Sequence, residues 1–190
     1  MKGQVVLIGG GVRCGKSAFA LQRARELGDR RVFIATAQAF DAEMRARIDA
    51  HQAERGGAFE TIEEPLALTQ ALRTQAARAD VVVIDCLTLW LSNLLLHDLS
   101  DDAIADHVAE LAAELAQRRC HSVLVTNEVG MGLVPDNVLG RRFRDCVGRA
   151  HQVLTPQSDE LYFGVLGSLL RMRPAPLGLV DKKEPHATHP

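Results

Sequence analysis

Aromatic side chains are scarce in this chain, and cationic residues are not in excess. Phe, Trp and Tyr make up 4% of the 190 residues, and 22 Lys and Arg stand against 24 Asp and Glu, a formal net charge of −2. Proteins that bind nucleic acid usually carry a basic surface, so this balance gives no support to a nucleic-acid partner. We therefore expect none.

Long apolar runs are also missing. The longest candidate, CLTLWLSNLLL over residues 86–96, is too short to cross a bilayer and contains Ser92 and Asn93. The N-terminus runs almost at once into an apolar strand and a glycine loop, so we expect no signal peptide. The four cysteines have no short paired spacing, which argues against a zinc site and favours reduced thiols. We expect a cytoplasmic protein with no stable membrane insertion.

Short apolar runs alternate with segments of helical periodicity. QVVLIGG, RRVFIATA, DVVVIDC and HSVLVTNE are typical of buried strands, and the segments between them place apolar residues at helical spacing. This alternation predicts a single α/β domain with a mainly parallel sheet flanked by helices, and ELYFGVLGSLLRM predicts an antiparallel edge strand at its C-terminal side. We place the domain at residues 1–172 and expect the proline-rich, charged tail 173–190 to be disordered.

The segment GGGVRCGKS contains the pattern G-x-x-x-x-G-K-[ST] between a predicted strand and a predicted helix. Its glycines allow the backbone to wrap closely around phosphates, and the helix N-terminus adds a favourable dipole. Lys16 is placed to reach the β- and γ-phosphates, and the Ser17 hydroxyl to bind Mg²⁺. The pattern predicts a P-loop NTPase-like fold whose nucleotide-binding residues are Gly10, Gly11, Val12, Arg13, Cys14, Gly15, Lys16 and Ser17.

Two acidic residues stand at the ends of other predicted strands. Asp85 is the last residue but one of DVVVIDC and is the expected partner of Mg²⁺, or alternatively the N-cap of the following helix. Glu128 follows VLVTN, where ligand crevices form in open sheets. It is a second candidate for Mg²⁺ or a general base, or simply a loop carboxylate.

The predicted helix FDAEMRARIDAHQAERGG carries His51 between Arg47 and Arg55, each four residues away and therefore on the same face. Three chemistries compete: a small-molecule kinase, a GTP switch, and a nucleotidyl transferase with a covalent intermediate. A switch would require a guanine-specifying N-K-x-D, which the sequence lacks. A covalent transferase needs a nucleophile such as imidazole, whereas a plain kinase does not. From the residues alone, His51 is either that nucleophile or a solvated helix residue.

Several motifs occur in the order and spacing of one family: GGGVRCGKSAFA, FIATAQAFDAEMRARIDAHQAERG, TIEEP, VVVIDCLTLWLSNLL and VLVTNEVGMGLVPDN. From residue 4 to about 170, the chain resembles the bifunctional adenosylcobinamide kinase / adenosylcobinamide-phosphate guanylyltransferase family of cobalamin biosynthesis. The resemblance implies that ATP or GTP phosphorylates the aminopropanol hydroxyl of adenosylcobinamide. GTP then guanylylates a histidine, with release of pyrophosphate, and the GMP passes to adenosylcobinamide phosphate, giving adenosylcobinamide-GDP.

The resemblance also implies roles for individual residues. His51 falls on the guanylylated histidine. From helical spacing rather than from the resemblance, we expect Arg47, together with Arg55, to meet the phosphates of GMP. Asp85 and Ser17 remain the expected Mg²⁺ ligands. Further nucleotide contacts fall on Ala35, Thr36, Ala37, Gln52, Ala53, Glu54, Arg55, Glu63 and Asp85. The alternatives are a helix-surface ion pair for Arg47 and a helix-start charge for Glu63.

Other histidines have no ligand spacing, and we interpret His97, His107, His121 and His151 as structural or exposed. Trp90 is expected in the core or at a subunit interface, and the resemblance implies a homotrimer. A monofunctional P-loop kinase and a non-catalytic NTP-binding regulatory protein remain the alternative functions.

Overall fold

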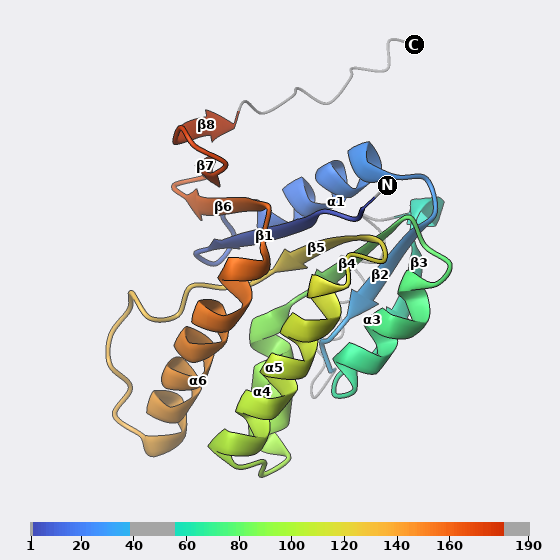
Figure 1. Ribbon diagram of the computed structural model, residues 1–190. Coiled ribbons are helices and arrows are strands. Elements are labelled where there is room, and N and C mark those ends of the chain that lie inside the picture. Colours follow the sequence, from blue (N-terminus) through green and yellow to red (C-terminus); the bar gives the residue numbers. More distant parts are fainter. Residues whose placement is uncertain (1, 39–55, 181–190) are drawn as a thin grey trace.

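An eight-stranded sheet in the order β3-β2-β4-β5-β1-β6-β7-β8 forms the centre of the molecule (Figure 1). The computed structural model describes residues 2–38 and 56–180. The strands are β1 (Val5–Gly10), β2 (Arg31–Ala35), β3 (Glu60–Glu63), β4 (Val81–Asp85), β5 (His121–Val125), β6 (Glu160–Val165), β7 (Ser168–Arg173) and β8 (Gly178–Val180). The predicted helix over residues 40–57 lies almost wholly outside the described residues.

Strands β1 to β6 are parallel, so their carboxyl ends meet at one edge of the sheet. β1 pairs with β5 on one side and β6 on the other, and β2 pairs with both β3 and β4. β7 runs antiparallel to β6, and β8 antiparallel to β7. The α/β fold with a mainly parallel sheet and an antiparallel C-terminal edge is therefore confirmed.

The predicted disorder of the tail is wrong for its first part. β8 pairs with β7 through Leu169 with Val180, Leu170 with Leu179 and Arg171 with Gly178. A proline-rich segment has little preference of its own for a strand, but the backbone hydrogen bonds to the exposed edge of β7 stabilise β8. Composition alone does not reveal such a partner, because the pairing depends on where β7 ends.

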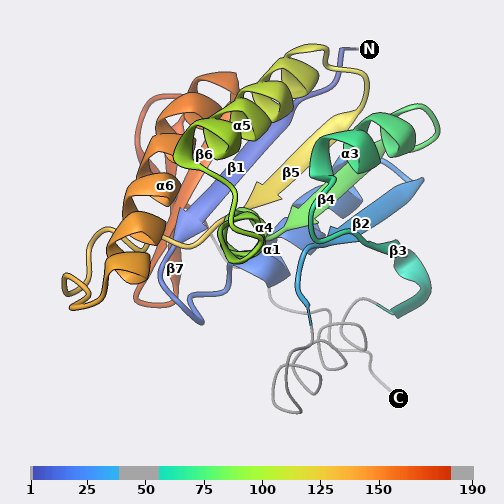
Figure 2. The same cartoon turned by 90° about the horizontal axis from the view of Figure 1, so that it is seen from below.

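Helices cover both faces of the sheet (Figures 1 and 2). α1 (Lys16–Leu27) lies on one face, and the other carries α3 (Leu68–Ala76), α4 (Leu87–Leu96), α5 (Asp101–Ala116) and α6 (Val138–Leu154). The period of a strand explains the division, since successive side chains point to opposite faces. Val5 and Leu7 of β1 pack with α3 to α6, whereas Val6 and Ile8 pack with α1.

Trp90 lies in the hydrophobic core of this single chain. Its side chain is fully buried among the helices that cover β4, and its Nε1 donates a hydrogen bond to the Leu66 carbonyl at 2.9 Å. The core alternative is therefore correct, because strands and helices of the same chain already enclose the indole.

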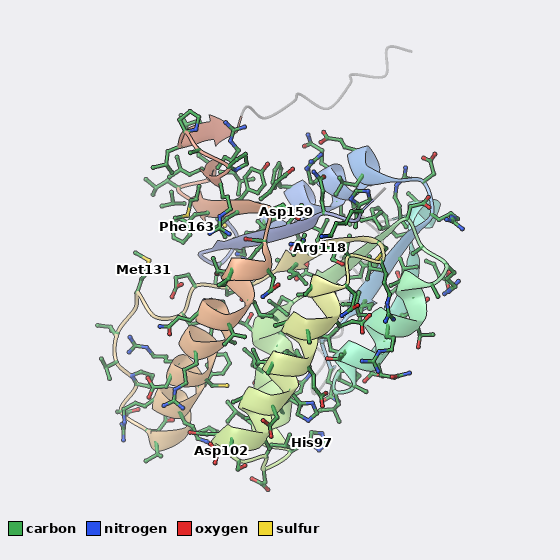
Figure 3. All side chains as sticks on the ribbon, viewed as in Figure 1. His97, Asp102, Arg118, Met131, Asp159 and Phe163 are labelled. Carbon is green, nitrogen blue, oxygen red and sulfur yellow. The ribbon has the colours of Figure 1, made fainter. Side chains whose placement is uncertain are left out.

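The amino-end edge of the sheet is closed by charged side chains. Figure 3 shows Arg118 and Asp159 near this edge, and Arg118 donates to the Asp159 carboxylate at 2.6 Å. The same carboxylate accepts from the Val5 amide at 2.7 Å. The predicted site lies at the opposite edge of the sheet, where the parallel strands have their carboxyl ends. Within residues 2–38 and 56–180, no helix is long and apolar enough to span a membrane.

Candidate active site

The predicted phosphate loop lies between β1 and α1, at the carboxyl edge of the sheet. Gly15 and Arg13 have φ angles of 94° and 55°, so the loop turns through two left-handed residues before the helix begins. Glycine adopts this conformation without steric cost. Lys16 is 6% exposed, and its Nζ donates to the Gly11 carbonyl at 2.5 Å. The ammonium is thus held over the backbone turn, where it can meet the phosphates of a nucleotide.

β6 packs directly beneath this loop. Gly10 is paired with Gly164, and the Gly11 amide donates to the Gly164 carbonyl at 3.3 Å. A Cβ on Gly10 would overlap the Gly164 backbone, and one on Gly164 would overlap the sulfur of Cys14. The Cys14 side chain is therefore buried against β6. The exposed residues of the loop are Gly11, Val12, Arg13 and Gly15, with Val12 81% exposed.

Asp85 lies at the carboxyl end of β4, in register with Ala35 of β2 and Val125 of β5. The N-cap of α4 is the next residue, Cys86, without a side-chain cap. The N-cap alternative for Asp85 is therefore wrong, because the helix starts one residue later. Burial, and next the charge of Asp85, raises the pKa of the Cys86 thiol to about 11. Cys86 is thus protonated at neutral pH and is a poor nucleophile.

Thr36 joins the ends of β2 and β4 in a fully buried position. Its hydroxyl donates to the Cys86 carbonyl at 2.7 Å and accepts from the Cys86 amide at 2.9 Å. The Thr36 amide donates to the Asp85 carbonyl, and Asn93 Nδ2 donates to the Thr36 carbonyl at 2.8 Å. We call Thr36, Cys86 and Asn93 the buried clamp. Thr36 has no exposed surface, so its side chain acts within the clamp, and nucleotide contact there stays a prediction.

Glu63 and Glu64 lie next to each other at the end of β3 but have different surroundings. Glu63 is exposed at the carboxyl edge, and its pairing partner on β2 is Ala35, a buried residue. The Glu64 carboxylate accepts from the Leu66 and Ala67 amides at 3.0 and 2.8 Å, just before α3. Glu64, not Glu63, therefore supplies the helix-start charge, which removes that alternative for Glu63.

Glu128 follows β5 and adjoins the phosphate loop. Its amide donates to the Gly10 carbonyl at 3.0 Å, and its carboxylate accepts from the Gly130 amide at 2.7 Å. His151 of α6 places Nδ1 3.7 Å from Glu128 Oε2 and Nε2 2.8 Å from the Thr126 hydroxyl. Sequence reasoning treated His151 as merely structural or exposed, so it missed this association between α6 and the end of β5.

The loop from Val129 to Asn137 connects β5 to α6, and we call it the apolar loop. Its side chains Met131, Leu133 and Val134 are 79%, 96% and 71% exposed. Figure 3 shows Met131 on the outer side of this connection. The backbone is nevertheless held. Arg144 of α6 donates to the Gly130 and Leu133 carbonyls at 2.8 and 3.1 Å.

The remaining predictions divide between described and undescribed residues. Ala35 is buried at the end of β2 and Ala37 is half-buried just after it. His97 is exposed, and His121 accepts a bond from the Gln4 amide at the amino-end edge. Outside the described residues lie Arg47, His51, Gln52, Ala53, Glu54 and Arg55, and their roles stay predictions.

A surface cavity of about 510 Å³ lies between α3 and α5. Its lining includes Arg73 and Glu114, which are paired at 3.0 Å, and none of the predicted site residues. The candidate site is thus the carboxyl edge of the sheet, which carries the loop, Asp85, Glu63 and Glu128, rather than this cavity.

The fold and the sequence both have known relatives. The RadB recombinase structure aligns with a TM-score of 0.54 over 94% of this chain and 86% of that chain, at 12% identity, which shows the fold alone. The bifunctional adenosylcobalamin biosynthesis protein CobP of Pseudomonas aeruginosa is 42% identical over 173 residues, covering 90% of this chain and 98% of that protein. The corresponding CobU protein of Salmonella typhimurium is 36% identical, covering 86% and 96%.

The family description agrees with these relatives. The cobinamide kinase / cobinamide phosphate guanyltransferase family matches residues 6–172, which include the phosphate loop, Asp85, Glu128 and His151. With this match and relatives above 30% identity along most of its length, the chain belongs to the cobinamide kinase / cobinamide phosphate guanyltransferase family.

Proposed function

We propose that this chain catalyses two successive reactions. It phosphorylates the aminopropanol hydroxyl of adenosylcobinamide with ATP or GTP. It then transfers GMP from GTP, through His51, to adenosylcobinamide phosphate, with release of pyrophosphate. The observation that carries this proposal is the extent of the family match, since residues 6–172 span both the phosphate loop and the His51 segment.

The first reaction needs a bound triphosphate and little covalent chemistry from the protein. The loop from Gly10 to Ser17 supplies a backbone turn at a helix N-terminus, with the Lys16 ammonium already directed to its interior. These groups orient and neutralise the phosphates. Ala35, Ala37 and Glu63, at or just after the paired ends of β2 and β3, would contact the nucleoside, as the family resemblance implies.

Mg²⁺ fits the oxygen donors at this edge. Ser17 is half-buried in the first turn of α1, and Asp85 ends β4, against which α1 packs. Among the described residues no group of three or more His, Cys, Asp or Glu side chains is arranged to hold a metal. Mg²⁺ usually takes one or two protein oxygens together with water and phosphate oxygens, and Ser17 and Asp85 would supply the protein oxygens. When bound, it would neutralise charge on the phosphates.

The second reaction needs a nucleophile. In our proposal a neutral His51 imidazole attacks the α-phosphorus of GTP, and the bond to the pyrophosphate leaving group breaks. Arg47 and Arg55 would neutralise the charge on the transferred phosphoryl group. Gln52, Ala53 and Glu54 would contact the same nucleotide. Sequence spacing and the family support these roles.

Assembly and compartment complete the proposal. The family resemblance supports a homotrimer. The four cysteines form no disulfides, which agrees with a reducing cytoplasm.

The test is incubation with Mg²⁺ and GTP labelled at the α-phosphate, followed by a denaturing gel. Wild type is compared with His51→Ala, and with His97→Ala as a control because His97 is exposed. We expect acid-labile, alkali-stable label on wild type and His97→Ala only, as a phosphoramidate requires. Wild-type protein without label would exclude the guanylyltransferase reaction. The chain would then be at most a monofunctional kinase, or a regulatory NTP-binding protein if it also phosphorylated no alcohol.

A further inference from the structure

Glu128 is fixed beside the phosphate loop by its backbone. β5 pairs with β1 up to Val125 and Ile8, and the Thr126 amide then donates to the Ile8 carbonyl at 3.0 Å. The Glu128 amide continues the pairing with the Gly10 carbonyl. The residue therefore keeps a constant position relative to the first residue of the loop that receives the nucleotide phosphates.

The Glu128 carboxylate is held from two sides. The Gly130 amide donates to Oε1 at 2.7 Å, and His151 Nδ1 lies 3.7 Å from Oε2. The carboxylate side chain remains 30% exposed, so a substrate can reach it. The separation from His151 exceeds a hydrogen bond, but catalytic hydrogen bonds are often long before the substrate binds.

His151 is itself held in one orientation. Its Nε2 lies 2.8 Å from the hydroxyl of Thr126, a residue that is only 2% exposed. Burial lowers the pKa of His151, more than the nearby Glu128 charge raises it, so the imidazole is neutral at pH 7. A neutral imidazole has one N–H donor and one acceptor nitrogen. Only the tautomer with hydrogen on Nδ1 donates toward Glu128 and accepts from Thr126.

We propose that Glu128 is the catalytic base of the kinase step and that His151, held by Thr126, is the positioning residue that aims its carboxylate. This inference rests on the proposed function. The substrate hydroxyl oxygen forms a bond to the γ-phosphorus of the nucleotide. The bond from that phosphorus to the β–γ bridging oxygen breaks, and its electron pair leaves with the nucleoside diphosphate. The hydroxyl proton passes to Glu128.

Only the kinase reaction should require Glu128. Guanylylation of His51 removes no proton from an alcohol, so it does not need Glu128. A role of Glu128 or His151 in folding or nucleotide binding would instead affect both reactions. The two half-reactions in one protein therefore provide an internal control.

The experiment measures steady-state phosphorylation of adenosylcobinamide and the single-turnover GMP labelling rate for four variants. Glu128→Gln removes the base. His151→Ala removes the positioning contact, whereas His151→Asn retains a donor and an acceptor in similar places. His121→Ala is the matched control, because His121 is also a half-buried, hydrogen-bonded histidine but lies at the amino-end edge. Urea unfolding checks that each variant is folded.

We expect Glu128→Gln to lower kcat of the kinase by about 10²–10⁴-fold, the usual contribution of a general base, with little change in KM. His151→Ala should lower kcat by roughly tenfold with little change in KM. A tenfold lower rate corresponds to an activation barrier that is about 1.4 kcal/mol higher. His151→Asn should recover kcat to within about threefold of wild type, because it restores a neutral hydrogen bond. Every variant should keep the wild-type rate of GMP labelling.

Three results would overturn the proposal. Glu128→Gln or His151→Ala with wild-type kinase kcat would remove the base or its positioning residue. His151→Asn as slow as His151→Ala would show that the imidazole does more than orient Glu128. A parallel loss of kinase activity and GMP labelling would assign both residues to folding or nucleotide binding. A wild-type protein that phosphorylates no adenosylcobinamide would instead disprove the proposed kinase function, and this inference with it.

Discussion

Thr36 and Met131 lie in two regions at the carboxyl edge of one sheet, yet their surroundings are opposite. Thr36 is fully buried, and its hydroxyl satisfies both the amide and the carbonyl of Cys86. Met131 is 79% exposed, and its loop is held by the half-exposed side chains of α6. The buried clamp thus depends on hydrogen bonds without water, and the apolar loop on hydrogen bonds that water can replace.

This difference separates rigidity from adaptability. A buried polar group left without its partner costs far more than an exposed one, because water cannot take the partner's place. The clamp therefore fixes the ends of β2 and β4, which border the proposed nucleotide site. The apolar loop can shift at lower cost, because water can take the place of the groups that hold its backbone.

The largest effect is expected from breaking the clamp. Thr36→Val keeps the shape of the side chain but leaves the buried Cys86 amide without its partner, whereas the Cys86 carbonyl still accepts from the Trp90 amide. We expect the free energy of unfolding to fall by roughly 1–3 kcal/mol, the cost of one buried donor without a partner. Urea unfolding monitored by circular dichroism measures it. Thr36→Ser is the control, and it should lose only about 1 kcal/mol with the methyl group. Equal losses in the two variants would contradict the clamp.

A smaller effect is expected from releasing the apolar loop. Arg144→Ala removes the donors to the Gly130 and Leu133 carbonyls, and water can replace both. The free energy of unfolding should fall by about 1 kcal/mol or less, while proteolysis within residues 129–137 becomes several-fold faster. Arg149→Ala on the same helix should leave the cleavage rate unchanged. A loss of stability as large as that of Thr36→Val would erase the distinction between the two regions.

The smallest effect concerns pH. The buried clamp contains no histidine. The apolar loop, in contrast, is followed by α6, and His151 of this helix lies close to Glu128. Because the pKa of His151 is lower in the folded protein than its ordinary value of 6.5, the unfolded chain takes up the proton first as the pH falls. Stability from this group is therefore complete above pH 6.5 and is lost as the pH falls through the folded pKa. Urea unfolding of wild type and His151→Asn at a series of pH values measures the difference. Parallel curves would show that His151 does not titrate as inferred.

The parts of the site that sequence predicts well are local in the chain. The phosphate loop follows from a strand, a glycine pattern and a helix start that are contiguous, and the structure places them as expected. The ends of β4 and β5 follow from apolar runs, which is why Asp85 and Glu128 lie at the carboxyl edge. Periodicity specifies these features because each depends on neighbouring residues.

The parts that sequence misses depend on contacts between distant segments. His151 has no motif of its own, and its link to Thr126 exists only because α6 packs beside the end of β5. Asn93 looks like one polar interruption in an apolar helix, although its amide closes the clamp. β8 likewise forms only because β7 leaves an edge to pair with. In each case, tertiary packing selects the partner.

The strand order has a consequence for synthesis on the ribosome. β1 is made first, yet it pairs with β5 and β6, which are made much later. Gly164 of β6 packs against the phosphate loop. A nascent chain that stops before this residue therefore contains the nucleotide motif but not the strand that supports it. Domains generally fold as units during translation. A growing chain of this protein therefore gains the support of its proposed nucleotide site only when β6 has emerged, long after the motif itself.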